Sequence, residues 1–321
     1  MMALPSPQQL RYLTTLADLR HFGRAAVSCG VTQSTLSAGI LALERQLGLA
    51  VLDRAAGRRP VLTPAGEEIA SRARQALTAL ESVAEVAVAA RAPLHGAFRL
   101  GVIPTVAPFL LPRLLPALRE NFPGLRLSLS EDVTGQLLEK LGDGRLDLLL
   151  LAMPCACEAL ETLPLTRDPF LAALPPGHRL QAHAQLTLAA LGQERLLLLE
   201  DGHCLRDQVL SACRQEGGWD AGAEERFAAT SLQTLVQMVD HGLGVTLLPR
   251  LAVRSGIADG SGLVLRPLAE EGAWRTIGLA WRPRSVRRLE FLSIASLLAT
   301  LLSDPAVAGE PEQDGVARDR R

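Results

Sequence analysis

The sequence lacks the features that mark membrane and secreted proteins. No stretch approaches the roughly 18 uncharged apolar residues that a membrane helix requires. Residues 1–10 have no basic start followed by an apolar core, as a secretory signal would have. We therefore expect a cytoplasmic protein with no membrane segment. Because 48% of the residues are hydrophobic and 21% are charged, the composition is globular, and 321 residues predict two or three domains.

Cysteine is scarce and odd in number, which excludes a small fold stapled by disulfides. The five cysteines are spread along the chain, at Cys29, Cys155, Cys157, Cys204 and Cys213. In a reducing cytosol we expect all of them to rest as thiols. A disulfide among them would then be transient, and it would indicate a catalytic or sensory role.

The spacing of metal ligands is also missing. The histidines other than His203 show no ligand spacing, so they are interpreted as ordinary surface or core residues. Cys155 and Cys157 supply only two thiolates, whereas a structural zinc site needs four ligands. We predict no metal and no cofactor. The simplest interpretation of this pair is a surface or packing role, with a soft-metal site and a second redox pair as the open alternatives.

The net charge of −1 excludes a uniformly basic nucleic-acid binder, but the charge is unevenly distributed. Residues 1–75 contain nine arginines and five acidic residues, a charge of +4, so the remaining 246 residues carry −5. A basic N-terminal module on an acidic body is typical of a regulator with one DNA-reading end, because attraction to phosphate is needed only there. A chance fluctuation of a few charges would give the same pattern.

The first ~60 residues predict two helices joined by a tight turn, after an initial helix rich in leucine. The second helix begins at Phe22 and ends at Gly30, and Thr32 is a good N-cap for the third. The apolar face of the third helix repeats at Leu36, Ile40, Leu43 and Leu47. Small polar side chains precede or separate these residues, at Gln33, Ser34, Thr35 and Ser37. This arrangement indicates a helix-turn-helix.

A wing and a long helix follow. Residues 51–62 predict two short strands, and the basic tip between them contains Arg54, Arg58 and Arg59. Thr63 and Pro64 predict the N-cap and first position of a helix that extends to about residue 90. The apolar stripe of this helix consists of Ile69, Ala73, Ala76, Leu80, Val83 and Ala87. Such a stripe is wide for an isolated helix and predicts a dimer seam.

The rest of the chain alternates strands with helices. Near-continuous apolar runs predict buried parallel strands at 97–103, 126–130 and 147–153, with helices between them at 106–121 and 134–141. A second set follows, with strands at 170–174, 196–199, 245–248 and 277–281 and helices at 205–216 and 232–241. This order predicts an α/β body with two lobes. The polar tail at 304–321 is expected to be disordered.

Four segments resemble the winged-helix signature of the LysR-type transcriptional regulators, in the same order and spacing: FGRAA at 22–26, TQSTLS at 32–37, LERQLG at 43–48 and LTPAG at 62–66. The proline that is common near the start of the recognition helix is Ser34 here. The resemblance implies an α/β protein with a winged helix-turn-helix DNA-binding domain at 1–63 and a linker and dimerisation helix at 64–92. A two-lobed, periplasmic-binding-protein-like regulatory domain would occupy 93–303.

The resemblance also implies how double-stranded DNA is bound. The residues expected to face the major groove are Gln33, Ser34, Thr35 and Ser37. Those expected to meet phosphates are Arg54, Arg58 and Arg59.

Further segments resemble the peroxide-sensing branch of this family: IPTV at 103–106, LEDGHCLRDQ at 199–208, ATSL at 229–232 and RTIGL at 275–279. This resemblance implies an activator of antioxidant genes that is switched by hydrogen peroxide through a reversible disulfide between Cys204 and Cys213. The expected partners are RNA polymerase, a thiol reductant of the glutaredoxin or thioredoxin type, and further copies of the chain in a homodimer or homotetramer. The residues expected around the reactive thiol are His203, Arg206, Asp207, Arg275, Thr105 and Thr134.

The residues around Cys204 suit thiol chemistry, because cations and a helix N-terminus favour the reactive thiolate. His203 and Arg206 flank it, and the segment enters a predicted helix. Cys213 is nine residues further on, about 13 to 14 Å away along a helix, whereas a disulfide requires roughly 4.4 to 6.8 Å between Cα atoms. Oxidation would therefore have to unwind the helix. We expect Cys204 to be the nucleophile and Cys213 the resolving thiol.

Three other interpretations remain. The body could bind a small metabolite between its lobes, as most proteins of LysR type are thought to do, but such a receptor would not need the two cysteines beside His203. The chain could be a thiol peroxidase, although its N-terminal 60 residues would then have no catalytic use. Cys204 and Cys213 could also be two ordinary, partly buried thiols.

Overall fold

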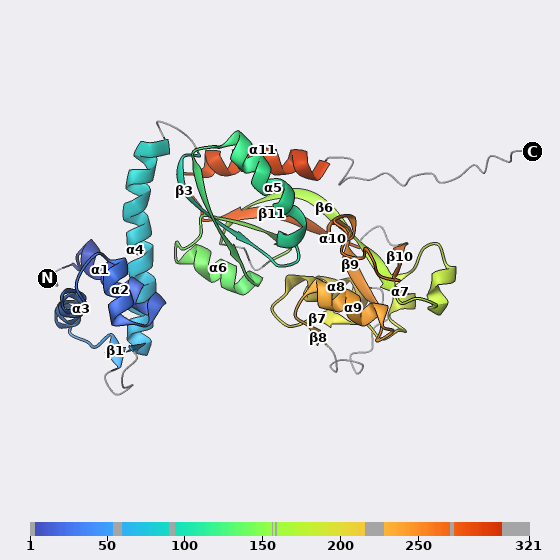
Figure 1. The fold of residues 1–321 in the computed structure, drawn as a ribbon, viewed down its shortest axis with the longest axis horizontal. Helices are drawn as coiled ribbons and strands as arrows, with labels where there is room; N and C mark the ends of the chain where they lie inside the picture. Colours follow the sequence, from blue (N-terminus) through green and yellow to red (C-terminus); the bar gives the residue numbers. More distant parts are fainter. Residues whose placement is uncertain are drawn as a thin grey trace, which may run out of the picture. The chain divides into compact units, whose positions relative to one another are not determined.

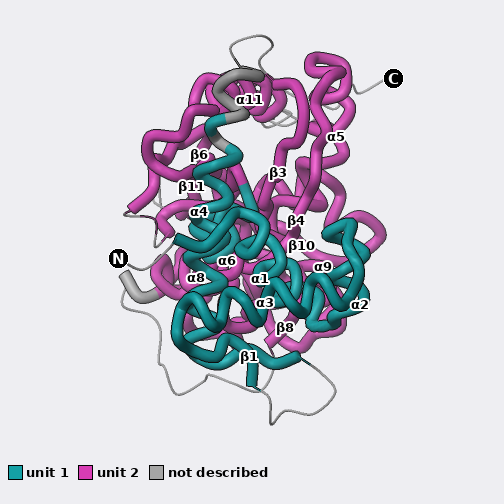
Figure 2. Tube along the Cα trace, turned by 90° about the vertical axis from the view of Figure 1, so that its left-hand side faces the viewer, with its two compact units in different colours: residues 1–93, 139–146 teal, residues 94–138, 147–321 magenta. Residues whose placement is uncertain are grey.

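The computed structural model describes residues 4–53, 60–89, 94–155, 157, 159–215, 228–269 and 273–303. The chain forms two compact units, coloured separately in Figure 2. Unit 1 comprises residues 1–93 and 139–146, and unit 2 comprises residues 94–138 and 147–321.

Unit 1 begins with the predicted helix-turn-helix. Its three helices are α1 (Pro7–Leu19), α2 (Phe22–Ser28) and α3 (Gln33–Leu47). The hydroxyl of Thr32 accepts a hydrogen bond from the backbone N–H of Thr35 at 3.2 Å, which confirms the predicted N-cap of α3. Gly30 adopts a φ of +67° in the turn, a conformation that glycine reaches without strain.

The core of unit 1 forms where α1, α2 and α3 meet. Leu36, Ile40 and Leu43 are buried in it, as the helical spacing predicts. Gly39 allows α3 to approach α1 closely, because a Cβ at this position would lie 2.6 Å from Cδ2 of Tyr12. The side chain of Glu44 is also buried, and its Oε1 accepts hydrogen bonds from the backbone N–H groups of Val51 and Leu52. That carboxylate fixes the start of the wing against α3.

The wing is the antiparallel pair β1 (Leu52–Asp53) and β2 (Val61–Leu62). Its tip, residues 54–59, lies outside the described residues, and so do the predicted phosphate contacts Arg54, Arg58 and Arg59. The long helix α4 (Pro64–Ala89) follows. The hydroxyl of Thr63 accepts from the backbone N–H of Gly66 at 3.0 Å, so Thr63 caps α4 as predicted.

The predicted apolar stripe of α4 divides into two parts. Near the start of the helix Ala70 and Ala73 are buried, and Ile69 packs against the core of unit 1. Further along, Leu80 is 51% exposed and Val83 is 71% exposed. The start of α4 therefore packs in the core of unit 1, whereas its later apolar side chains lie on the surface.

Unit 2 is built on a seven-stranded sheet with the order β10-β6-β11-β5-β3-β4, in which β9 also pairs with β6 (Figure 1). Its strands are β3 (Gly96–Val102), β4 (Leu125–Glu131), β5 (Leu148–Met153), β6 (Glu161–Leu174), β9 (Thr246–Pro249), β10 (Val264–Pro267) and β11 (Trp274–Trp281). A separate parallel pair consists of β7 (Leu198–Leu199) and β8 (Ala228–Ala229). The first three strands of the sheet are parallel to one another, and β11 is antiparallel to both of its neighbours.

Helices accompany the strands of both lobes. The first lobe carries α5 (Ala107–Asn121), α6 (Thr134–Gly142) and α11 (Arg288–Ser303), and the second carries η1 (Arg179–Ala182), α7 (Leu188–Leu191), α8 (Cys204–Gln215), α9 (Leu232–Asp240) and α10 (Arg250–Arg254). The second lobe has its own core, to which α8 contributes Leu205, Val209, Leu210 and Cys213. The predicted two-lobed α/β architecture is confirmed.

The structure corrects two expectations about the strands. The predicted strand at 170–174 is the end of the 14-residue β6, which pairs with β11 over its first part and with β9 and β10 over its last. The strand at 126–130 is not buried as predicted, because β4 lies at the edge of the sheet and its side chains alternate in exposure. The predicted strand at 277–281 is confirmed as part of β11, which is antiparallel to both of its neighbours.

Within the described ranges, no single helix has the length and hydropathy of a membrane span. Taken together, α2 and α3 reach that hydropathy, but the chain bends by 98° between them.

Candidate functional site

The candidate site is a pocket of about 640 Å³ in unit 2, at the start of α8. The residues that line it are Thr134, Gly135, Leu138, Pro154, Cys155, Gly202, Cys204, Asp207, Gln208, Ser211, Ala212 and Trp274. The structure thus brings together three of the predicted site residues, Cys204, Thr134 and Asp207. Such a volume is typical of a small-molecule site.

Cys204 is the first residue of α8, which fixes the environment of its sulfur. Backbone N–H groups at a helix N-terminus lack intrahelical partners and stabilise a nearby anion. Gly202 enters the helix with a φ of +93°, which explains why a glycine precedes His203 here. The predicted neighbour Arg206 pairs with Asp201 at 2.9 Å and donates to the carbonyl oxygen of Leu199 at 3.2 Å. Arg206 therefore secures the turn before Cys204.

Two polar atoms at this pocket are buried without a hydrogen-bond partner among the described residues. They are Oγ1 of Thr134 and Oε1 of Gln208. The amide nitrogen of Gln208 donates to the carbonyl oxygen of Met153 at 3.4 Å, which orients the side chain. A buried polar atom that makes no hydrogen bond costs about 1 to 3 kcal/mol. Two of them beside one thiol indicate a pocket suited to a small molecule that forms hydrogen bonds.

His203, which precedes Cys204, is partly buried. Burial lowers the pKa of His203 from its ordinary value of 6.5, and the nearby charge of Glu200 only partly opposes that shift. The imidazole is therefore mainly neutral at neutral pH. The role of His203 beside the thiol of Cys204 stays a prediction.

Arg275 and Thr105 lie together in the structure, as part of a buried polar group. The guanidinium of Arg275 donates to Oγ1 of Thr105 at 2.8 Å and to its carbonyl oxygen at 3.0 Å. Its Nε also pairs with Asp168 at 2.9 Å. Neither Arg275 nor Thr105 is among the described residues that line the Cys204 pocket. In this structure they connect β11, β6 and the loop after β3.

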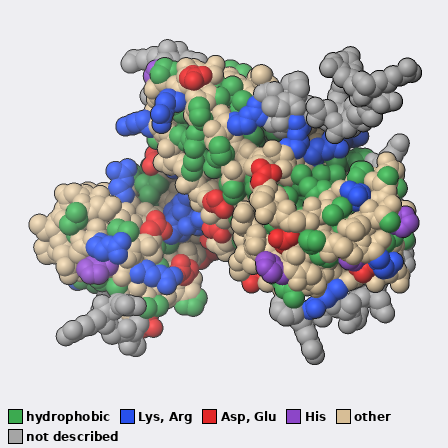
Figure 3. All heavy atoms as spheres, turned by 45° about the vertical axis from the view of Figure 1, so that its right-hand side comes forward, with side chains coloured by type: hydrophobic (Ala, Val, Ile, Leu, Met, Phe, Trp, Pro, Cys, Tyr) green, Lys and Arg blue, Asp and Glu red, His purple; other side chains and the backbone are tan. Residues whose placement is uncertain are grey.

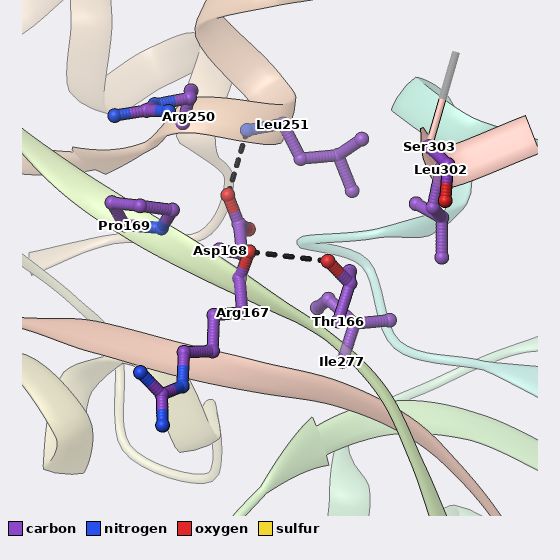
Figure 4. Close-up of a pocket in the computed structure, with 9 residues that line it drawn as sticks. All are labelled: Thr166, Arg167, Asp168, Pro169, Arg250, Leu251, Ile277, Leu302 and Ser303. Carbon is purple, nitrogen blue, oxygen red and sulfur yellow. Dashed lines mark hydrogen bonds between the residues drawn. The ribbon is translucent and has the colours of Figure 1, made fainter. Parts of the chain in front are cut away.

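Asp168 also lines a smaller pocket of about 330 Å³. Figure 4 shows its carboxylate pointing toward α10, where Oδ1 accepts from the backbone N–H of Leu251 at 2.8 Å. The guanidinium of Arg167 lies over the ring of Trp274, 4.4 Å from its centroid. The carboxylate of Asp168 is thus already occupied by structural contacts.

The two predicted redox cysteines are both thiols in the structure, at opposite ends of one helix. Cys204 is partly exposed, whereas Cys213 is 1% exposed and packs in the core of the second lobe. Because α8 is continuous between them, their Cα atoms are about 13 to 14 Å apart. A bond between these sulfurs requires α8 to unwind.

Cys155 and Cys157 correct the expectation that every cysteine rests as a thiol. They form a disulfide, with 5.2 Å between their Cα atoms. Both cysteines follow Pro154, after the end of β5. Their separation lies within the usual range for a disulfide.

The surface predicted to read DNA is the N-terminal end of α3. All four of its predicted base contacts are exposed, at Gln33, Ser34, Thr35 and Ser37. The Oγ1 of Thr32 lies 2.9 Å from the hydroxyl of Ser34 and 2.8 Å from that of Thr35, so the cap orders these side chains. On the face of the molecule that Figure 3 draws, basic and acidic side chains are interspersed.

Two family models match the chain. The model described as "Bacterial regulatory helix-turn-helix protein, lysR family" matches residues 7–67, and that described as "LysR substrate binding domain" matches residues 91–316. The chain belongs to the LysR family of bacterial transcriptional regulators.

The chain is also similar to individual members of this family. It is 41% identical over 300 residues to a "Probable hydrogen peroxide-inducible genes activator" of Streptomyces viridosporus, which covers 94% of this chain and 95% of the relative. It is 41% identical over 293 residues to the "DNA-binding transcriptional dual regulator OxyR" of Escherichia coli, covering 91% of this chain and 94% of that protein.

Two solved structures extend the comparison. One is a full-length Cys-to-Asp variant of OxyR from Pseudomonas aeruginosa, with a TM-score of 0.77 and 35% identity over 92% of this chain and 98% of that one. The other is a Cys-to-Ser variant of OxyR from Corynebacterium glutamicum, described as bound to H₂O₂. Its TM-score is 0.64, with 34% identity over 96% of this chain and 95% of that one.

Sequence reasoning missed two residues of the pocket that bear on its chemistry. Gln208 lies four residues after Cys204, and side chains at this spacing share a helix face, so a search at helical spacing from the reactive thiol would have found it. Cys155 enters from a loop 49 residues earlier in the chain. No local pattern connects that loop to α8.

Proposed function

We propose that this protein is a DNA-binding transcription regulator that senses hydrogen peroxide at Cys204. The observation that carries the proposal is the pair of buried, unpartnered atoms beside this thiol, Oγ1 of Thr134 and Oε1 of Gln208. Hydrogen peroxide has two O–H donors and two acceptor oxygens, so it can donate to Gln208 and exchange a hydrogen bond with Thr134. The names of the relatives support the same function.

The reaction begins when the thiolate of Cys204 attacks one oxygen of the peroxide. The O–O bond breaks, a sulfenic acid forms, and the second oxygen leaves as hydroxide and is protonated to water. The thiolate of Cys213 then attacks the sulfur of the sulfenic acid. The Cys204–Cys213 disulfide forms, and a second hydroxide leaves and becomes water. The peroxide is reduced by two electrons, and the two thiols are oxidised by two.

Formation of this disulfide changes the fold because α8 cannot remain helical once it forms. The helix must unwind to bring its ends within about 4.4 to 6.8 Å, and Cys213 must leave a core in which it is 1% exposed. Leu205, Val209 and Leu210 leave the same core with it. A segment with two packings of this kind is a two-state element that can alter a subunit interface.

The remaining assignments complete the proposal. Residues 1–63 bind double-stranded DNA, residues 64–92 join two copies into a homodimer that can pair into a homotetramer, and residues 93–303 sense peroxide. We infer that the protein acts in the cytoplasm, activates antioxidant genes through RNA polymerase, and is reset by a thiol reductant of the glutaredoxin or thioredoxin type. The chain itself is a regulator, with one oxidation per reset and no catalytic turnover.

The test uses the full-length Cys204→Ser and Cys213→Ser variants. In protein whose Cys155–Cys157 disulfide is already formed, as in the structure, one equivalent of hydrogen peroxide should let a dimedone probe label Cys204 in Cys213→Ser, because the sulfenic acid has lost its resolving partner. Cys204→Ser should give no label and no transcriptional response. A fully responsive Cys204→Ser variant would show that the peroxide acts elsewhere. Cys29→Ser, which removes a thiol of the helix-turn-helix, is the matched control and should respond like the wild type.

A further inference from the structure

A second pair of sulfur atoms adjoins the Cys204 pocket. Cys155 lines the pocket together with Cys204, and its disulfide partner Cys157 is 6% exposed. The function proposed above uses Cys204 and Cys213 alone, so it leaves this pair without a role.

Cys155 is better placed than Cys213 to meet an oxidised Cys204. Both Cys155 and Cys204 border one pocket, and Cys155 stands in irregular backbone after β5. Cys213 is buried at the far end of α8, about 13 to 14 Å away along the helix. A bond to Cys213 requires α8 to unwind and Cys213 to leave the core of the second lobe, whereas Cys155 already borders the same pocket as Cys204.

We propose that Cys155 and Cys157 form a second redox couple that takes the oxidation from Cys204 while α8 stays folded. The proposal rests on the proposed function in one respect, namely that peroxide oxidises Cys204 to a sulfenic acid. Cys155 is then a resolving thiol for the same reaction, and Cys157 completes the transfer.

The transfer proceeds in two balanced steps from the form in which both residues are thiols. The thiolate of Cys155 attacks the sulfenic sulfur of Cys204, a disulfide between them forms, and hydroxide leaves and is protonated to water. The thiolate of Cys157 then attacks the sulfur of Cys155 in this mixed disulfide. The Cys155–Cys157 bond forms, and Cys204 leaves as a thiolate. The product is the disulfide that the structure contains.

The couple sets how much peroxide is needed to switch the protein. A reduced chain passes its first oxidation to Cys155 and Cys157, which restores Cys204 and leaves α8 intact. Once the couple is oxidised, the second oxidation of Cys204 can be resolved only by Cys213, and α8 unwinds. A dithiol reductant that restores Cys155 and Cys157 resets this first stage.

The experiment starts from the full-length protein, reduced with a phosphine and desalted without air. Hydrogen peroxide is added at one and then two equivalents per chain, thiols are blocked with N-ethylmaleimide, and the linked peptides are mapped by mass spectrometry. In the wild type, the first equivalent should give mainly Cys155–Cys157 and the second should give Cys204–Cys213. In Cys155→Ser, the first equivalent should already give Cys204–Cys213. Cys29→Ser, which removes a thiol outside the pocket, should match the wild type.

The intermediate is trapped in a double variant, Cys157→Ser with Cys213→Ser, where a mixed disulfide between Cys204 and Cys155 should accumulate. Because Cys157 is buried, Cys157→Ala with Cys213→Ser provides a second version that adds no polar group to the core. Equal rates of Cys155–Cys157 formation in Cys204→Ser and the wild type would overturn the transfer. Dimedone labelling of Cys204 in the double variants, with no mixed disulfide, would overturn the transfer and leave peroxide sensing intact. If Cys204 is not labelled and no mixed disulfide forms, both proposals are overturned.

Discussion

Arg275 and Asp168 are cross-strand partners in β11 and β6, and their side chains form an ion pair with 2.9 Å between Nε and Oδ2. Arg275 is 1% exposed and Asp168 is 4% exposed. Arg275 also donates a hydrogen bond to Thr105, and Asp168 also accepts one from the backbone N–H of Leu251. Both charged side chains therefore have further hydrogen-bond partners. The pair lies where β6 passes from its partner β11 to its partners β9 and β10. It therefore braces the strand that both lobes share.

Removing one member of this pair should destabilise the protein strongly. We expect Arg275→Met to lower the free energy of unfolding by about 3 to 5 kcal/mol, because it leaves the carboxylate of Asp168 buried without its counter-charge. Urea denaturation of the full-length protein measures this change. Glu68→Gln is the control, since it breaks the exposed Glu68–Arg72 pair and should cost about 1 kcal/mol or less. Similar losses in the two variants would contradict the role of the buried pair.

The hydroxyl of Thr134 should accelerate the oxidation of Cys204. Thr134→Val keeps the shape of the side chain but removes a hydrogen bond worth about 0.5 to 1.5 kcal/mol, so the rate of sulfenic acid formation should fall about 2- to 10-fold. Stopped-flow measurement with limiting peroxide gives the rate. Thr166→Val makes the same change at a threonine outside the Cys204 pocket and should keep the wild-type rate. A Thr134→Val variant as fast as the wild type would remove this residue from the site.

The partly buried His203 should make the stability of the protein depend on pH. Burial lowers its pKa below 6.5, so the folded state favours the neutral imidazole. The stability that this preference contributes is fully present above the unfolded value of 6.5, and it is lost as the pH falls below that value toward the lower folded pKa. Between about pH 7.5 and about pH 5.5, the free energy of unfolding should therefore fall less in His203→Gln than in the wild type. Equal falls in urea denaturation would refute this assignment.

The wing and the recognition helix should affect DNA binding differently. Neutralising Arg58 should weaken binding to all sequences and reduce the slope of log K against log salt by about one unit, because one phosphate contact is lost. Gln33→Ala should change base preference and leave that slope unchanged. Fluorescence anisotropy with two operator sequences over a range of salt separates these effects. An Arg58 variant with altered base preference and an unchanged slope would reverse the assignment.

The exposed part of α4 should hold two copies together. Leu80→Asp combined with Val83→Asp places charges on apolar surface, so the dissociation constant of the dimer should rise at least about tenfold, which corresponds to about 1.4 kcal/mol. Light scattering at micromolar concentrations measures the change in mass. Gln75→Asp adds one negative charge at another exposed position of α4 and should leave the dimer intact. A monomeric wild type at these concentrations would exclude the proposed seam.

The sequence predicted the helices of unit 1 well because their burial follows a local period. Leu36, Ile40 and Leu43 recur every three or four residues, and all three are buried. β6 was harder, since its first half contains Thr162, Pro164 and other residues that interrupt an apolar run. Its strand conformation comes from pairing with β11, more than 100 residues later in the chain. Residues 161–169 by themselves give no indication that they pair with β11.

The candidate site was predictable where it is local to α8. Cys204 and its helix N-terminus follow directly from the residues around them, and Cys213 is one helix length away. The charge state of His203 was not predictable, because it depends on burial by residues from elsewhere in the chain. The pairing of Arg275 with Asp168 depends likewise on the register of two distant strands.

Gly39 allows α3 to pack against Tyr12 at a distance that no larger residue permits. It lies two positions after Ser37, on the helix that we propose reads DNA. Any side chain at this position would push α3 away from α1 and displace its base-contacting residues, although the new side chain would point away from the operator. In a genetic screen, substitutions of Gly39 should therefore be recovered among the mutants that fail to regulate, with normal peroxide chemistry at Cys204.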